Sequence, residues 1–127
     1  MKKHSLEVKA EQRDAATCVY RLSGVLYGTV EAYAFQEQTR QKVSEGVRKI
    51  VLDLGAVERI DSSGIGILVT VAFSTHRAGG AIVLASVPPR VRDTLSIALL
   101  LDRIETADSV DEALGRLDRV HLPPGPR

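Results

Sequence analysis

The pattern of hydrophobic and polar positions predicts four strands in the first two thirds of the chain. Apolar and charged residues alternate over Leu6–Ala10, which predicts an edge strand with one face in solvent. A second strand is predicted over Thr17–Leu22, ended by Ser23-Gly24, and the short connection favours an antiparallel pair. Continuous apolar runs at Ile50–Leu54 and Ala81–Ala85 predict strands that are buried on both faces.

Four helices are predicted from the 3.6-residue periodicity and from capping signals. The first is expected to start at Glu31 with Thr29 as a candidate cap, the second at Ser62, the third at Pro88-Pro89, and the fourth after a capping box that begins at Ser109. The third helix is expected to bury one apolar face, formed by Val91, Leu95, Ala98 and Leu99. A short, weak strand over residues 103–106 is expected between the third and fourth helices.

This order of elements indicates the fold class. After the antiparallel pair, strands and helices alternate, which predicts a single α/β domain with a mainly parallel sheet and right-handed crossovers. The 127 residues are enough for one hydrophobic core. We expect the domain to span residues 1–118 and the proline-rich tail 119–127 to be disordered.

Candidate chemistry is concentrated where the second helix begins. Asp61-Ser62-Ser63 follows a predicted buried strand and precedes a long apolar segment, so either Asp61 or Ser62 could cap the helix. Free N–H groups and the helix dipole at this point favour a phosphate on Ser62, whereas the charge of Asp61 opposes it. Taken alone, these three residues are explained more simply by capping than by modification.

The predicted second helix is apolar on nearly all sides. Such a helix is either largely buried or shares a surface with a partner. Gly64 and Gly66 each cost about 1 kcal/mol relative to alanine inside a helix. We therefore expect another backbone to approach the start of this helix closely.

The central stretch resembles a known family signature. Val51-Leu52-Asp53-Leu54 followed by Ile60-Asp61-Ser62-Ser63-Gly64-Ile65-Gly66 is similar to the signature of STAS domains, specifically bacterial anti-sigma factor antagonists. The similarity runs from about Leu6 to Leu117 and includes Leu22-Ser23-Gly24, Gly79-Gly80 before Ile82-Val83-Leu84, and Leu101-Asp102. The resemblance implies a small mixed sheet with helices packed against it.

The resemblance also implies a function and a site. The unmodified domain would bind an anti-sigma factor that is a serine kinase and so free the sigma factor, and phosphorylation of Ser62 by that kinase would prevent binding. The expected partner-binding residues are Asp61, Ser62, Ser63, Gly64, Ile65, Gly66 and Tyr27. An alternative within the same superfamily is a non-catalytic scaffold subunit of a signalling assembly or of a transporter complex.

Two positions depart from the family pattern. Tyr27 stands where many members carry an acidic residue after the upstream glycine, and its ring is expected either to cap the sheet edge or to reach a phosphate with its hydroxyl. At Leu99-Leu100-Leu101 the family often has a glycine before the matching leucine. We expect Leu100 to be exposed and to mark an interface.

Composition narrows the choice of partners and compartment. A net charge of +1 and the absence of Trp give no basis for direct nucleic-acid or membrane binding. Cys18 is the single cysteine and is expected to be a small buried core residue, which suits a reducing cytoplasm. No leader or membrane-spanning segment is evident, so we expect a cytoplasmic protein, with a homodimer left open.

Enzymatic function lacks the residues it would need. Ser62 and Ser63 are not in a G-x-S-x-G turn, and none of the three histidines, His4, His76 and His121, is placed to act as their base. No cluster has metal-ligand spacing, and Gly64-Ile65-Gly66 is too short for a phosphate-binding loop. We therefore expect no catalytic activity, no metal and no cofactor.

Overall fold

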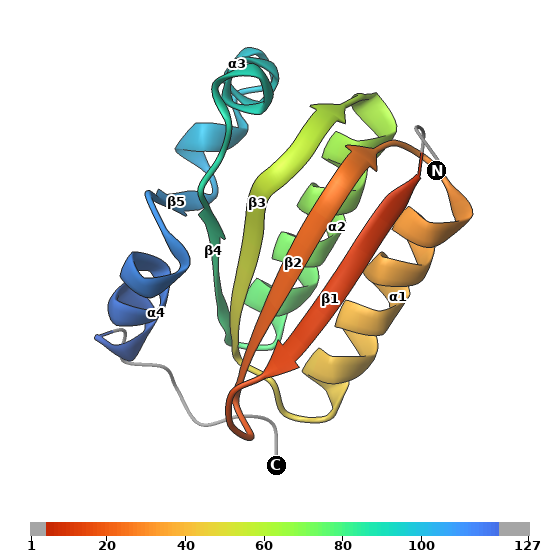
Figure 1. Cartoon of the computed structure of the whole chain (residues 1–127). Coiled ribbons are helices and arrows are strands. Elements are labelled where there is room, and N and C mark those ends of the chain that lie inside the picture. Colours follow the sequence, from red (N-terminus) through yellow and green to blue (C-terminus); the bar gives the residue numbers. More distant parts are fainter. Residues whose placement is uncertain (1–4, 120–127) are drawn as a thin grey trace.

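The computed structural model describes residues 5–119. Most of the predicted disordered tail, residues 120–127, and the terminal histidines His4 and His121 lie outside the described residues. Within residues 5–119 the chain forms one five-stranded sheet with helices on both faces (Figure 1).

The sheet is mixed and mainly parallel, as the sequence predicted. Its strands lie in chain order, β1-β2-β3-β4-β5, an order that the sequence did not indicate. The first pair is antiparallel, and the other three pairs are parallel. The strands are β1 (Leu6–Gln12), β2 (Thr17–Leu26), β3 (Lys49–Ile60), β4 (Ala81–Ala85) and β5 (Glu105–Ala107).

Helices cover the two faces of the sheet unequally. The helical elements are α1 (Val30–Ser44), α2 (Ser62–Arg77), α3 (Pro89–Ile97), the 3-10 turn η1 (Leu100–Asp102) and α4 (Val110–Asp118). Figure 1 shows α1 and α2 side by side behind β1, β2 and β3, and α4 beside β4 on the other side of the sheet. The starts of α1, α3 and α4 match the predicted caps, since Thr29 and Ser109 accept from backbone N–H groups and Pro89 opens α3.

The core has two parts, separated by the sheet. The larger part lies between the sheet and helices α1 and α2, where the rings of Tyr20 and Phe35 meet edge to face with centroids 5.4 Å apart. The smaller part lies under α4 and contains Val19, Val51 and Val83. Neighbouring residues such as Val19 and Tyr20 thus enter opposite parts of the core, as expected for central strands buried on both faces.

Cys18 belongs to the larger core, as predicted. It is 1% exposed, and its burial raises the pKa of the thiol. A buried thiol of raised pKa is a poor nucleophile. Cys18 therefore acts as a small apolar core residue.

Two strands continue beyond their predicted ends. Ser23-Gly24 does not end β2, and Gly55 does not break β3; the two strands stay paired as far as Leu26 and Ile60. Gly24 has a φ of +99°, and two shifts of register flank it, so the pairing passes through an irregularity instead of stopping. This extension carries the start of α2 to the far end of the sheet.

The predicted positions of Leu99 and Leu100 are wrong in opposite ways. The sequence placed Leu99 on the buried face of the third helix and Leu100 at the surface, but Leu99 is 68% exposed and Leu100 is 8% exposed. Helix α3 ends at Ile97, so Ala98 is exposed too, and Leu99 adopts the left-handed conformation with φ of 61°. This left-handed residue redirects the chain, so that the next side chain enters the core.

Candidate functional site

Asp61, not Ser62, caps helix α2. The Oδ1 atom of Asp61 accepts a hydrogen bond of 2.9 Å from the Gly64 N–H, and Asp61 itself has an extended backbone. Ser62 is the first helical residue, and its hydroxyl makes no hydrogen bond within residues 5–119. The backbone N–H groups of Ser62 and Ser63 also lack an acceptor in this part of the chain.

The two serines differ in accessibility. Ser62 is exposed, whereas Ser63 is half-buried against the loop that precedes α1. A Cβ atom added to Gly28 would lie 2.9 Å from the Cβ of Ser63, 3.0 Å from its Oγ and 3.4 Å from the Tyr33 hydroxyl oxygen. Of the two serines, only Ser62 is an exposed residue.

Gly64 confirms the predicted close approach, and Gly66 does not. A Cβ atom on Gly64 would lie 1.9 Å from the carbonyl oxygen of Leu26, so the start of α2 rests directly on the end of β2. No atom lies within 4 Å of the corresponding point on Gly66, which is exposed. The backbone at Gly66 is instead open to solvent.

All seven predicted site residues lie at one end of the molecule. Asp61 to Gly66 form the end of the β3–α2 connection and the first turn of α2. Tyr27 follows β2 directly, and the last residue of β2, Leu26, pairs with Ile60 just before Asp61. Tyr27 is half-buried, and Ile65 packs against the larger core.

Sequence reasoning missed the contribution of α1 to this site. Helices α1 and α2 both follow parallel strands, so their N-termini lie at the same end of the sheet (Figure 1). Val30 and Tyr33, in the first turn of α1, are 85% and 49% exposed. The tight contact of Gly28 with Ser63 joins the two helix starts into one surface. The sequence contains one signal for this contact, the glycine at position 28 directly before the Thr29 cap. It could not be interpreted from the sequence, because the residue that packs against Gly28 is the distant Ser63.

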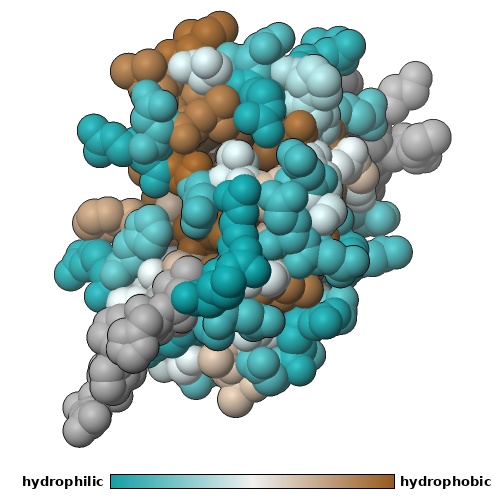
Figure 2. Space-filling model, turned by 90° about the vertical axis from the view of Figure 1, so that its left-hand side faces the viewer, coloured by the Kyte–Doolittle hydropathy of each residue, from teal (hydrophilic) through white to brown (hydrophobic). Residues whose placement is uncertain are grey.

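An apolar surface continues from this end along the exposed side of α2. Val69 and Phe73 are large exposed side chains, and the Arg77 guanidinium lies 5.5 Å from the centre of the Phe73 ring. A groove of ≈ 270 Å³ lies between α2 and η1, lined in part by Val69, Phe73, Leu100 and Ile104. Figure 2 shows further hydrophobic surface gathered at the α3 end of the molecule, where Ile97 and Leu99 are exposed.

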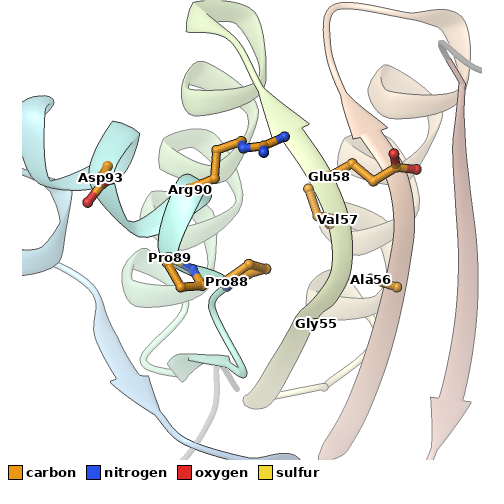
Figure 3. Close-up of a pocket in the computed structure, with 8 residues that line it drawn as sticks. All are labelled: Gly55, Ala56, Val57, Glu58, Pro88, Pro89, Arg90 and Asp93. Atoms are coloured by element: carbon orange, nitrogen blue, oxygen red, sulfur yellow. The ribbon is translucent and has the colours of Figure 1, made fainter.

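A second, larger groove lies between the final part of β3 and the start of α3. It measures ≈ 660 Å³ and is lined by Gly55, Ala56, Val57, Glu58, Pro88, Pro89, Arg90 and Asp93. The carboxyl ends of parallel strands often bind ligands. In Figure 3, however, the Arg90 side chain extends towards β3, while the carboxylates of Glu58 and Asp93 point away from Arg90. These charged groups do not converge on a common point.

Helix α2 keeps Ser62 apart from the histidine that the same helix carries. His76 lies in the last turn of α2 and Ser62 in the first, so this helix holds them at opposite ends. Among residues 5–119, no group of three or more His, Cys, Asp or Glu side chains is placed to hold a metal ion. None of the helices described here combines the length and apolar character required to span a membrane.

Comparisons with known proteins agree on one family. The family model of the STAS domain matches residues 7–113. The protein BtrV of Bordetella bronchiseptica, named as an anti-sigma factor antagonist, is 30% identical over 92 residues, which are 72% of this chain and 78% of the relative.

Solved structures agree on the fold. A structure from Thermotoga maritima, named as an anti-sigma factor antagonist, is 27% identical with a TM-score of 0.76 and covers 88% of this chain and 95% of its own. The antagonist SpoIIAA in its unphosphorylated form has a TM-score of 0.77 at 22% identity, over 91% of this chain and 99% of its own. The phosphorylated form of SpoIIAA from Bacillus gives a TM-score of 0.62 at 24% identity, over 87% of this chain and 98% of its own.

Proposed function

The chain belongs to the STAS domain family, and from that premise we propose that it is an anti-sigma factor antagonist switched off by phosphorylation of Ser62. Unmodified, it binds an anti-sigma factor that is also a serine kinase, and the sigma factor is released. Phosphorylated at Ser62 by that kinase, it no longer binds. The observation that carries the proposal is the exposed Ser62 at the start of α2, beside the capping Asp61.

The unmodified surface suits close docking of a protein partner. Ser62 and Gly66 are both small and exposed, and Ser63 beside them is small and half-buried, so no bulky side chain at these positions keeps a partner away from the first turn of α2. Ile65 and the exposed side chains of the first turn of α1 add apolar contacts around them. A partner can therefore approach α2 closely and exclude water from the contact.

A phosphate on Ser62 changes this surface by charge and hydration. It adds about −1.5 to −2 charge next to the carboxylate of Asp61. The free N–H groups of Ser62 and Ser63 offset part of this repulsion, but a docking partner must still desolvate the dianion. A change of about 2–4 kcal/mol in binding free energy corresponds to a loss of affinity of roughly thirty- to a thousand-fold.

The switch requires no change of fold. The cap of α2 is the Asp61 carboxylate, so modification of the Ser62 hydroxyl breaks no hydrogen bond within residues 5–119. The Gly64 contact with β2 likewise stays intact. Phosphorylation therefore acts on the surface and leaves the sheet and helices in place.

A comparison of three baits in lysate from the source organism tests the proposal. Wild type and Ser62→Ala are expected to retain an ATP-binding anti-sigma factor, identified by mass spectrometry, and Ser62→Asp is expected to retain much less of it. Retention of the same scaffold or transporter proteins by all three baits would contradict the proposal and support the scaffold alternative. Neighbouring genes offer an inexpensive second check, because an adjacent anti-sigma kinase gene supports the antagonist role.

A further inference from the structure

The exposed side of α2 carries a row of residues that the folded chain leaves uncovered. Gly66, Val69 and Phe73 follow Ser62 at spacings that place all four on one side of the helix, and Arg77 continues the row. Val69 is 42% and Phe73 60% exposed, although both are large and apolar. We call Ser62, Gly66, Val69, Phe73 and Arg77 the α2 stripe.

No contact that the structure shows within residues 5–119 requires a glycine at position 66. A glycine inside a helix is unfavourable unless something requires the absence of a side chain. Gly64 meets this condition because Leu26 lies against it, but the space around Gly66 is empty. The stripe thus combines a patch of bare backbone at Gly66 with a protruding ring at Phe73, two helical turns further on.

These two features are complementary to each other across a two-fold axis. The midpoint between Gly66 and Phe73 lies between Val69 and Thr70, and so does the midpoint between Ser62 and Arg77. If two copies of α2 pack antiparallel about this point, each Phe73 ring faces the other copy's bare Gly66. The same axis brings each Arg77 to the start of the other copy's α2. Self-complementary patches of this kind are typical of two-fold homodimers.

The charges at the two ends of α2 favour the same antiparallel alignment. Asp61 lies at the start of the helix, and His76 and Arg77 lie in its last turn. None of these three side chains makes an ion pair within residues 5–119. Antiparallel packing places opposite charges and opposite ends of the helix dipoles together, whereas parallel packing would bring like charges together.

We propose that a second copy of this chain docks on the α2 stripe and forms an antiparallel α2–α2 homodimer. The dimer covers Phe73 and Val69 and also covers Ser62, because Ser62 begins the same stripe. Dimer formation therefore competes with the binding of any other protein at Ser62. The inference goes beyond the proposed antagonist role and depends only on the chain itself.

Sedimentation of the purified full chain over a concentration series tests the proposal. A monomer–dimer equilibrium is expected at concentrations up to about 100 μM. Phe73→Ala and Gly66→Gln are each expected to weaken it at least about tenfold, which is roughly 1.4 kcal/mol. Gly66→Gln should melt at the same temperature as wild type or higher, because the space around Gly66 is open. Ala34→Gln, at an exposed position on α1, is the matched control and should leave the dimer unchanged.

Two further variants test the alignment. Arg77→Glu is expected to weaken the dimer by placing like charges together, and the addition of Ser62→Lys should restore it. Val69→Cys lies beside the proposed axis and should form a disulfide-linked dimer on mild oxidation. The native Cys18 is buried and does not compete for this disulfide.

Two results would overturn the proposal. A chain that stays monomeric throughout the series excludes a second copy and leaves the stripe to a different protein. A dimer that is unaffected by both Phe73→Ala and Gly66→Gln forms elsewhere on the molecule. Neither result bears on the antagonist role, which the bait comparison decides separately.

Discussion

Ser62 and Ser63 are adjacent in the sequence, yet their surroundings predict different reactivity. Ser62 is exposed, while Ser63 packs against Gly28 beside the Tyr33 hydroxyl. We expect the kinase partner with ATP to label wild type and Ser63→Ala, but not Ser62→Ala, as measured by incorporation of labelled phosphate. Labelling of Ser62→Ala at the wild-type level would place the acceptor elsewhere.

Single residues at the site show the limit of sequence reasoning. Asp61 and Ser62 can both cap a helix, and only the extended backbone of Asp61 and its bond to Gly64 distinguish them. Gly64 and Gly66 are alike in sequence, but a Cβ atom on Gly64 would clash with Leu26 of β2, whereas a Cβ atom on Gly66 would have no atom within 4 Å. The gathering of these residues at the start of α2 was predictable from local motifs, whereas the packing of each one depends on non-local neighbours.

At the scale of elements, the packing of α2 on β2 depends on Gly64. Gly64→Ala places a methyl group where the Leu26 carbonyl oxygen lies, so backbone must move. Overpacking of this kind is expected to cost about 3 kcal/mol or more and to lower the melting temperature by roughly 10 °C. Gly66→Ala is the matched control and is expected to be neutral or stabilising by up to about 1 kcal/mol. Equal melting temperatures for the two variants would contradict the close packing of α2.

The end of α3 offers a stabilising substitution. Leu99 has a left-handed backbone, which glycine adopts without the steric cost of a Cβ atom, and its side chain is largely exposed. Leu99→Gly is therefore expected to stabilise the fold by about 1 kcal/mol in denaturant unfolding. Leu99→Ala keeps the strained Cβ while it shortens the exposed side chain, so it should gain much less. If Leu99→Ala stabilised the fold as much as Leu99→Gly, the cause would be the removal of exposed apolar surface and not the relief of backbone strain.

The elements themselves were predictable to different degrees. Periodicity and caps predicted all four helices, because the buried face of α1 and the caps at Thr29 and Ser109 are local features. The ends of β2 and β3 were not predictable. Whether a strand stops at Gly24 or continues through an irregularity depends on its pairing with the neighbouring strand, which the local sequence does not show. The reversal of Leu99 and Leu100 likewise follows from one backbone angle that the hydrophobic pattern does not contain.

For the whole molecule, the parallel sheet explains why the site forms where it does. Strands β2 and β3 run in the same direction and each leads into a helix, so the starts of α1 and α2 meet at one end. The same end carries Ser62 and the exposed side chains Val30 and Tyr33. The sequence predicted this class of sheet from the alternation of elements, but the order of its strands requires contacts between distant segments.

Because the sheet and helices form this surface without help from the Ser62 side chain, a charge placed there should change binding and leave stability nearly unaltered. Ser62→Asp is expected to weaken partner binding by about 1–2 kcal/mol, or roughly five- to thirty-fold, because a carboxylate carries less charge and fewer acceptor oxygens than phosphate. An anion at a helix start is worth only ~0.3–1 kcal/mol, and Asp61 offsets part of this, so the melting temperature should scarcely move.

Calorimetric titration of the partner, at concentrations below those at which the chain self-associates, and a thermal melt of each variant decide this prediction. Ser62→Ala is the control and should bind as tightly as wild type, since the hydroxyl makes no hydrogen bond within residues 5–119. Wild-type affinity for Ser62→Asp would exclude the charge mechanism and favour a scaffold role. If Ser62→Asp binds weakly and also melts far below wild type, the substitution acts on folding, and a surface switch at Ser62 is contradicted.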